Sequence, residues 1–245
     1  FTEEYFLSVL HVTHIRRKLH DNFDGLIDMS DYASRPETER ENAFLSRALA
    51  AYVLQTLLET GAEEAALALI DGFDDNGIDG IHVDQAAKRV VIVQSKFDAR
   101  GNGSPSVEAV QKLIQGFDDL INARFQRFNA RLQARAAEIQ AALEDPQFVF
   151  ELVFAHTGQE DIEEQPRRLL EDLLQRANDV TELVFYRVLK QSDIHRFVSD
   201  ELEPGSINLD VVISDWGHKD GPVEAYYGLV PATDIADWYA TYGTR

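Results

Sequence analysis

The sequence predicts an α/β (α+β) fold in which a mixed β-sheet is flanked by helices and preceded by a helical amino-terminal region. Three observations support this class. Apolar residues up to about residue 70 recur at helical spacing, and residues 78–97 have the pattern of a β-hairpin. After the hairpin, strand-like runs alternate with helical stretches, which is typical of a sheet covered by helices.

Length and continuity predict a single domain. The chain has 245 residues, enough for one large domain, and it contains no internal repeat, low-complexity tract or convincing linker. We expect residues 1–70 to form the helical part and residues 71–155 the core that contains the hairpin. Residues 156–245 are expected to form an α/β continuation of the same sheet.

Two long helices are expected before the hairpin. Residues 4–20 form an amphipathic pattern that ends in a basic turn, where cations suit the helix dipole. Residues 37–60 place apolar side chains on one stripe, and Gly61 ends the helix. His11 and His14 lie three residues apart in the first helix. We expect them to pack in the fold or lie at its surface, because no acidic third metal ligand is nearby.

The hairpin, within residues 78–97, joins two segments rich in β-branched residues through a short polar link. It places Asp79 on the first strand, and Gln94 and Lys96 on the second. Because side chains alternate between the two faces of a strand, Gln94 and Lys96 share one face while Ser95 lies on the other.

A long charged stretch over residues 107–143 predicts a helix, with a break allowed near Gly116. Four arginines fall near one face of this helix, with phenylalanines alongside. This basic stripe consists of Arg124, Arg127, Arg131 and Arg135. Contact with nucleic-acid phosphates and an ordinary solvated face explain the stripe equally well.

Strands and helices alternate in the remainder of the chain. The near-continuous apolar character of residues 147–155 predicts a central strand. These elements would extend the sheet that the hairpin begins. Further strands are expected at 181–188, 208–214 and 223–230, with helices at 161–177 and 192–199.

The polar residues of the hairpin have the chemistry of a metal and phosphate site. An aspartate can hold a divalent cation, an amide oxygen can complete the coordination shell, and a lysine can orient or deprotonate a water. The alternative is an edge strand whose polar side faces solvent. The chain contains no GxSxG, Walker A or GxGxxG pattern, and the acidic loop at 74–77 lacks the glutamate of an EF-hand.

The pattern IDG at residues 78–80, followed by QSK at residues 94–96, resembles the PD-(D/E)xK nuclease superfamily, in the variant with glutamine at the middle acid. The segments GIDGIHVD and VVIVQSKF also resemble the amino-terminal nuclease-like domain of the AIPR (abortive infection phage resistance) family. Residues 225–243 are similar to the segment that precedes the AIPR domain proper. The resemblance implies a restriction-endonuclease-like sheet with residues 71–155 as its catalytic core.

The resemblance implies a Mg²⁺-dependent (or Mn²⁺-dependent) nuclease that hydrolyses DNA or RNA, with DNA the expected partner, in bacterial antiphage defence. By this analogy Asp79, the Gln94 side chain and the Ser95 carbonyl hold the metal. Lys96 would position the attacking water. A helical acid before the hairpin is common in this superfamily, and Glu41 is expected to fill that role because it lies deepest in its helix. The alternative is that the acids at this helix start are merely solvated.

The formal net charge of −20 conflicts with a nucleic-acid partner, because phosphate binding requires lysine and arginine. Local basic faces, another subunit of a homo-oligomer or a further carboxyl-terminal domain could supply the binding surface. The alternative function is a catalytically weak nuclease-fold module that binds nucleic acid or protein and oligomerises.

Composition indicates the cellular setting. The chain has no cysteine, which excludes disulfides and thiolate metal sites and favours a cytoplasmic location. No apolar run is long enough to span a bilayer, so we expect no membrane partner.

Overall fold

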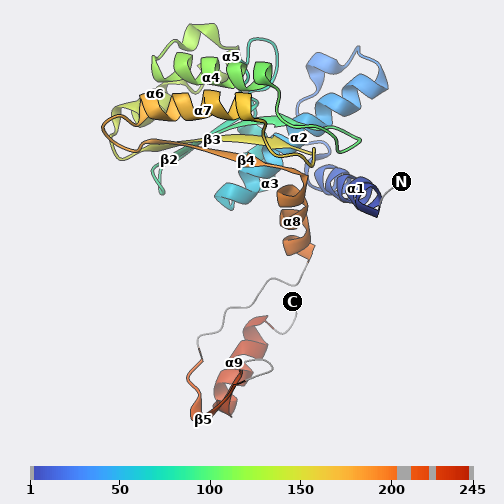
Figure 1. The fold of residues 1–245 in the computed structure, drawn as a ribbon, viewed down its shortest axis with the longest axis vertical. Helices are drawn as coiled ribbons and strands as arrows, with labels where there is room; N and C mark the ends of the chain where they lie inside the picture. Colours follow the sequence, from blue (N-terminus) through green and yellow to red (C-terminus); the bar gives the residue numbers. More distant parts are fainter. Residues whose placement is uncertain (1–2, 203–210, 221–224, 243–245) are drawn as a thin grey trace. The chain divides into compact units, whose positions relative to one another are not determined.

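The computed structural model describes residues 3–202, 211–220 and 225–242 (Figure 1). The chain divides into two units. The first, residues 1–198, contains a four-stranded sheet between two layers of helices. The second, residues 199–245, contains a two-stranded hairpin and the last helix. The predicted α/β class is confirmed, with a mixed sheet flanked by helices after a helical amino-terminal region.

The sheet of the first unit has the strand order β1-β2-β3-β4. Its strands are β1 (Gly80–Asp84), β2 (Arg89–Lys96), β3 (Val149–His156) and β4 (Val184–Leu189). β1 and β2 pair antiparallel, which confirms the predicted hairpin, whereas β3 and β4 extend the sheet in parallel. β3 is buried along nearly its whole length, as expected of a central strand with a continuous apolar sequence.

One face of the sheet packs against α1, α2, α3 and α8. Val91 and Val93 of β2 point to this face, where they join the apolar stripe of α2 in one core cluster. The buried part of α2 begins at Phe44, so its first turns remain free to line a site. The helices are α1 (Glu3–Phe23), α2 (Glu37–Leu58), α3 (Ala62–Leu67) and α8 (Gln191–Leu202), with the 3₁₀ turn η1 (Ser30–Tyr32) before α2.

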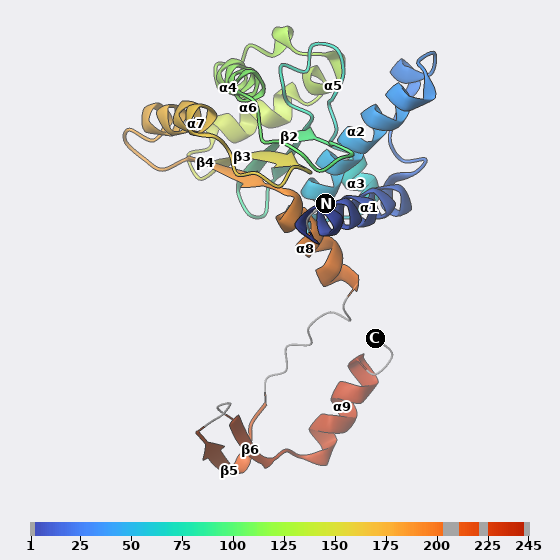
Figure 2. The same cartoon turned by 45° about the vertical axis from the view of Figure 1, so that its right-hand side comes forward.

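The opposite face packs against α4, α6 and α7, which both views place together on one side of the sheet (Figures 1 and 2). Val90 and Ile92 of β2 point to this side. The helix predicted over residues 107–143 is interrupted. Asn129 caps the short helix α5 with its side chain, which stabilises a turn in place of a continuous helix. The segments are α4 (Val107–Ile121), η2 (Phe125–Arg127), α5 (Ala130–Gln133) and α6 (Ala136–Glu144), and α7 (Glu164–Ala177) follows β3.

The second unit comprises β5 (Ser214–Lys219), β6 (Ala225–Leu229) and α9 (Ala232–Tyr242). β5 and β6 pair antiparallel in a sheet of their own. The expected continuation of the main sheet over residues 156–245 is therefore right for β4 and wrong for β5 and β6. Neighbouring strands close a hairpin at a smaller entropic cost than a longer return to the main sheet.

Of the two strands predicted for the second unit, the one at residues 208–214 is displaced and the one at residues 223–230 is confirmed. Of residues 208–214, residues 208–210 lie outside the described residues, and β5 begins only at Ser214. Of residues 223–230, residues 225–229 form β6. Across the described ranges, the structure has no helix that is both long and apolar enough to cross a membrane.

Candidate functional site

Asp79 is the residue before β1, and backbone hydrogen bonds hold it there. Its amide donates to the carbonyl of Val93 in β2 at 2.8 Å. Its carbonyl accepts from the amide of Ile70 at 2.8 Å and from the amide of Asp71 at 3.0 Å. The chain from residue 70 to residue 79 is therefore a closed loop whose two ends meet beside β2.

The carboxyl group of Asp79 is bound to Ser95 on the α2 face of β2. Oδ2 of Asp79 accepts from the Ser95 amide at 2.7 Å and lies 3.0 Å from the Ser95 hydroxyl. The same hydroxyl is 2.8 Å from the carbonyl of Ser46 in α2. A hydroxyl has one proton and cannot donate to both oxygens at once. A protonated Asp79 can donate to Ser95 while Ser95 donates to Ser46, which satisfies all three groups.

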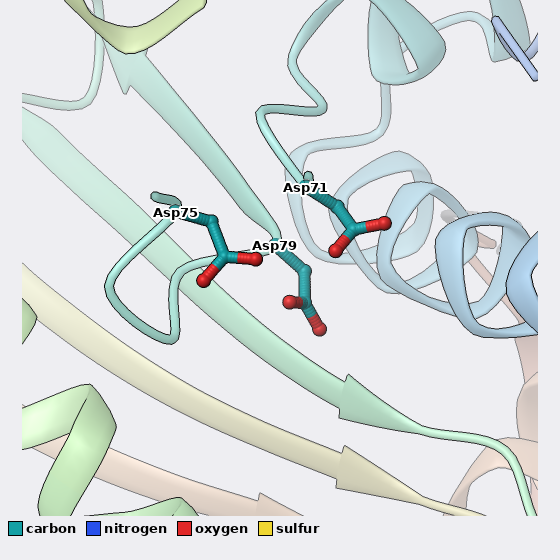
Figure 3. A group of neighbouring side chains, drawn as sticks. All are labelled: Asp71, Asp75 and Asp79. Carbon is teal, nitrogen blue, oxygen red and sulfur yellow. The ribbon is translucent and has the colours of Figure 1, made fainter. Parts of the chain in front are cut away.

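Asp71, Asp75 and Asp79 gather around the start of β1 (Figure 3), each with a carboxylate oxygen within 4.8 Å of the others. Two of these aspartates have a cationic partner. Arg47 Nε donates to Asp71 at 2.6 Å, and Lys112 Nζ donates to Asp75 at 3.0 Å. Asp79 forms no ion pair with any residue that the structure describes. The cluster therefore keeps an uncompensated negative charge when all three carboxyl groups are ionised.

Burial and neighbouring charge disfavour ionisation of Asp79. Burial raises the pKa of Asp79 to about 7, and the charge of Asp71 adds to the shift. The hydrogen bonds from Ser95 oppose the shift without cancelling it. Burial also raises the pKa of Asp71, against the opposing effect of Arg47. A divalent cation would reverse these shifts, because it stabilises the ionised carboxylates.

The cluster fits a hard divalent cation, which prefers carboxylate oxygens. Opposite ligands are about 4.8 Å apart across Ca²⁺ and about 4.2 Å apart across Mg²⁺. At most one pair of three ligands can lie opposite each other, so the acids, whose oxygens lie within 4.8 Å of one another, must approach to hold either ion. Oδ1 of Asp79 accepts no hydrogen bond from the described residues, so it is available to an ion.

A cavity of about 450 Å³ lies beside Asp79. Asp71, Asp79 and Ser95 line it from the loop and from β2. Spacings of three, four and seven residues place the lining residues of α2 on a single helical face. The α2 residues are Glu39, Asn42, Ala43 and Ser46, and Tyr32 of η1 completes the lining. Glu39 is therefore the α2 carboxyl group that shares a cavity with Asp79.

Glu41, the predicted helical acid, points elsewhere. Its Oε1 lies 3.2 Å from Nε2 of His20 and 4.0 Å from Nε of Arg16, both on α1. Successive residues of a helix are rotated by about 100°, so the directions of Glu39 and Glu41 differ by about 200°. The prediction that Glu41 faces the hairpin is wrong, because rotation about the helix axis, not depth along it, decides which acid reaches the site.

Gln94 and Lys96 share the opposite face of β2, as alternation predicts. Gln94 pairs in register with a residue of the core beneath α4 and α7, and its Oε1 is buried without a hydrogen-bond partner. Lys96 is exposed at the last position of β2. Among the described residues, no hydrogen bond or ion pair joins either side chain to Asp79. The structure thus brings together Asp79 and Ser95, but not the whole predicted set.

The four arginines of the predicted basic stripe do not share one helical face, because η2, α5 and α6 replace the expected helix. Arg124 and Arg127 both donate to the buried carboxylate of Asp119, at 3.2 and 2.9 Å. Arg131 and Arg135 donate to backbone carbonyls of the acidic loop and of β1. All four guanidinium groups form hydrogen bonds within the protein. Their contact with phosphates stays a prediction.

Asp71, Asp75 and Arg47 are site residues that the sequence analysis missed. The two aspartates precede Asp79 at regular spacings of four, but regular spacing within a loop does not imply convergence. Arg47 is 1% exposed and donates to Asp31 as well as to Asp71. Because a buried arginine requires acidic partners, an arginine inside the apolar stripe of α2 is the sequence signal for a nearby acid.

Comparisons of the chain with models of known protein families, with curated proteins and with solved structures found no match. The function of the site therefore has to follow from its residues, its geometry and the sequence resemblance of the hairpin.

Proposed function

We propose that the protein is a metal-dependent nuclease that hydrolyses phosphodiester bonds in DNA or RNA with Mg²⁺ or Mn²⁺. The observation that carries the proposal is the cluster of Asp71, Asp75 and Asp79, two members of which line a cavity. Clustered carboxylates beside a space for a substrate phosphate are what metal-assisted phosphoryl transfer requires. The resemblance of residues 78–97 to AIPR nuclease-like domains supports a role in bacterial antiphage defence.

The residues of the cluster would have distinct roles. Asp79 would hold the metal together with Asp71 and Asp75, and the bound ion would polarise the scissile phosphate and activate a water. Ser95 orients the Asp79 carboxyl group through its amide. Arg47 favours the ionised form of Asp71, which keeps that carboxylate available as a ligand.

Residues around the cluster would act on substrate and water. Glu39 lines the same cavity and can accept a hydrogen bond from a water there. Lys96, exposed at the end of β2, would neutralise charge that develops on the phosphate. We propose Oε1 of Gln94, which is buried without a partner, as a further oxygen donor. DNA is the substrate we favour.

A cleavage assay on single- and double-stranded DNA and RNA, with and without Mg²⁺, tests the proposal. Asp79→Ala should reduce cleavage at least about a hundredfold, the scale lost with one electrostatic contact to a transition state. Asp74→Asn is the matched control, because Asp74 is an exposed acid of the same loop and asparagine tolerates its φ of 61°. Cleavage retained by Asp79→Ala would overturn the metal-site assignment.

A catalytically weak module for binding and oligomerisation is the second candidate function. The placement of Gln94 and Lys96 on the face of β2 away from Ser95 favours it, as does the net charge of −20. Trp216 and Tyr227 of the second unit are exposed, as aromatic residues are at protein-binding surfaces. Light scattering, which measures self-association, distinguishes the two candidate functions. The binding module would be favoured if the protein self-associates, if Tyr227→Ser abolishes this self-association, and if no Mg²⁺-dependent cleavage is found.

A further inference from the structure

Three histidines that take no part in the proposed nuclease site lie together between α1 and α8. His11 and His14 are one turn apart on α1, and His195 is on α8. The ring of His195 stacks on that of His11, with centroids 3.8 Å apart, and its centroid is 5.5 Å from that of His14. Nδ1 of His14 and Nε2 of His195 are 3.2 Å apart, so one of these nitrogens donates and the other accepts.

The surroundings of His11 and His195 favour neutral imidazole. Burial lowers the pKa of His11, and the neighbouring His14 adds to the shift. Burial also lowers the pKa of His195, and both rings of α1 add to that shift. A neutral imidazole has a nitrogen lone pair, which is the form that binds metal ions.

We infer that His14 and His195 form a binding site for a transition-metal ion of the Zn²⁺ class, with His11 as a third ligand. Two imidazole nitrogens on a tetrahedral ion with bonds of about 2.0–2.1 Å are separated by roughly 3.3–3.4 Å. The 3.2 Å between Nδ1 of His14 and Nε2 of His195 is close to that separation. The ion would replace the proton that the two nitrogens share.

His11 adds the third donor through helical spacing. Residues i and i+3 lie on one face of a helix, and metal-binding pairs use this spacing. The His11 ring now stacks on His195, so rotation about its side-chain bonds must direct a nitrogen to the ion. Water would fill the remaining coordination position of a tetrahedral ion.

The histidine site is accessible and differs chemically from the aspartate cluster. His14 is exposed, and His11 and His195 are half-buried, so a hydrated ion can reach the nitrogens from solvent. Imidazole suits Zn²⁺, Ni²⁺ and Cu²⁺, whereas carboxylate suits Mg²⁺, Mn²⁺ and Ca²⁺. The chain would therefore hold two classes of ion at separate sites, and zinc would link α1 to α8.

Calorimetric titration of the full chain with Zn²⁺, without any polyhistidine tag, tests this inference. The Asp79→Asn background is used so that the aspartate cluster does not compete for the ion. We expect saturable binding of one Zn²⁺ and a rise in Tm. His14→Gln and His195→Gln should each weaken binding at least about tenfold, the lower end of the loss caused by removing a metal-site residue. His218→Gln, which changes a histidine of β5, should leave the affinity unchanged.

Circular dichroism establishes that the glutamine variants are folded, and glutamine keeps a polar side chain of similar size in the contact between α1 and α8. Equal Zn²⁺ affinity in the parent, His14→Gln and His195→Gln would overturn the inference and leave the three rings as packing. The titration does not depend on cleavage, so a negative nuclease assay does not affect this outcome.

Discussion

Neighbouring polar residues on the two faces of strand β2 differ in their hydrogen bonding. On the α2 face, the amide and hydroxyl of Ser95 both bond to Asp79, and the hydroxyl also reaches Ser46. On the α4 face, one residue earlier, Oε1 of Gln94 is buried without a partner. Such a group costs about 1–3 kcal/mol. The α2 face therefore positions the carboxyl group of Asp79. The α4 face retains the amide of Gln94, whose oxygen forms no hydrogen bond within the fold.

The same contrast extends from β2 to β3. His156, in register with Lys96, is buried, and its Nε2 also lacks a hydrogen-bond partner. Burial lowers the pKa of His156 to about 4, and the charge of Lys190 adds to the shift, so the ring is neutral at neutral pH. Unsatisfied polar atoms in a core are rare and call for an explanation. The chemistry therefore depends either on the α2 face of β2 alone or on both faces.

Lys96→Ala is the strongest test of whether both faces serve one reaction. We expect cleavage to fall about a hundredfold, as for Asp79→Ala, because a cationic contact to the transition state is lost. Lys190→Ala, at the residue that follows β4, is the matched control and should cleave nearly as well as wild type. Rapid cleavage by Lys96→Ala would confine the reaction to the α2 face.

Asp79→Asn should stabilise the protein at alkaline pH. The pKa of Asp79 is about 7 in the folded chain, against an ordinary value of 3.8. Between these pH values the folded state binds more protons than the unfolded state, so the free energy of unfolding falls as pH rises. Asp79→Asn has no ionisable group at this position, so its free energy of unfolding does not fall in this way. The difference from wild type amounts to roughly 1–3 kcal/mol.

Urea unfolding of wild type and Asp79→Asn at about pH 4 and about pH 8 measures this effect, and the difference should appear at the higher pH. Mg²⁺ should stabilise wild type at the higher pH and leave the variant unchanged, because the ion binds the ionised carboxylate. An identical pH dependence in the two proteins would contradict the desolvation of Asp79.

Glu39→Gln and Glu41→Gln compare two sides of α2 with the same chemical change. Glu39→Gln should weaken Mn²⁺ binding about tenfold, as removal of a group next to a metal shell does. Glu41→Gln should leave Mn²⁺ binding unchanged and cost at most about 1 kcal/mol of stability, because it loses only a partly exposed contact with His20. Calorimetry with Mn²⁺ separates the two, and the reverse order would restore Glu41 to the site.

Gln94→Met tests the α4 face of β2 directly. The substitution removes the unpartnered amide at similar volume, so the free energy of unfolding should rise by about 1 kcal/mol. Mn²⁺ affinity should fall at the same time if Gln94 donates its oxygen to the metal, as we propose. If wild type and Gln94→Met differ in stability but bind Mn²⁺ with equal affinity, Gln94 does not contact the ion.

The sequence by itself determined the hairpin and the faces of its residues, because a strand has a local period of two. The predicted strands are present as β1 and β2, and Ser95 lies opposite Gln94 and Lys96 as alternation requires. The α/β class followed from the same local periods. Local periods did not decide whether Glu39 or Glu41 reaches the cavity, since the packing of α2 on the sheet sets its rotation.

Only the tertiary structure decided which acids form the site. Asp71 and Asp75 lie in an irregular loop without a period, and they meet Asp79 because backbone hydrogen bonds close that loop. Arg47 of α2 and Lys112 of α4 then neutralise two of the carboxylates from helices that cover opposite faces of the sheet. Such convergence depends on contacts between residues far apart in the chain, and these contacts form only when the whole unit packs.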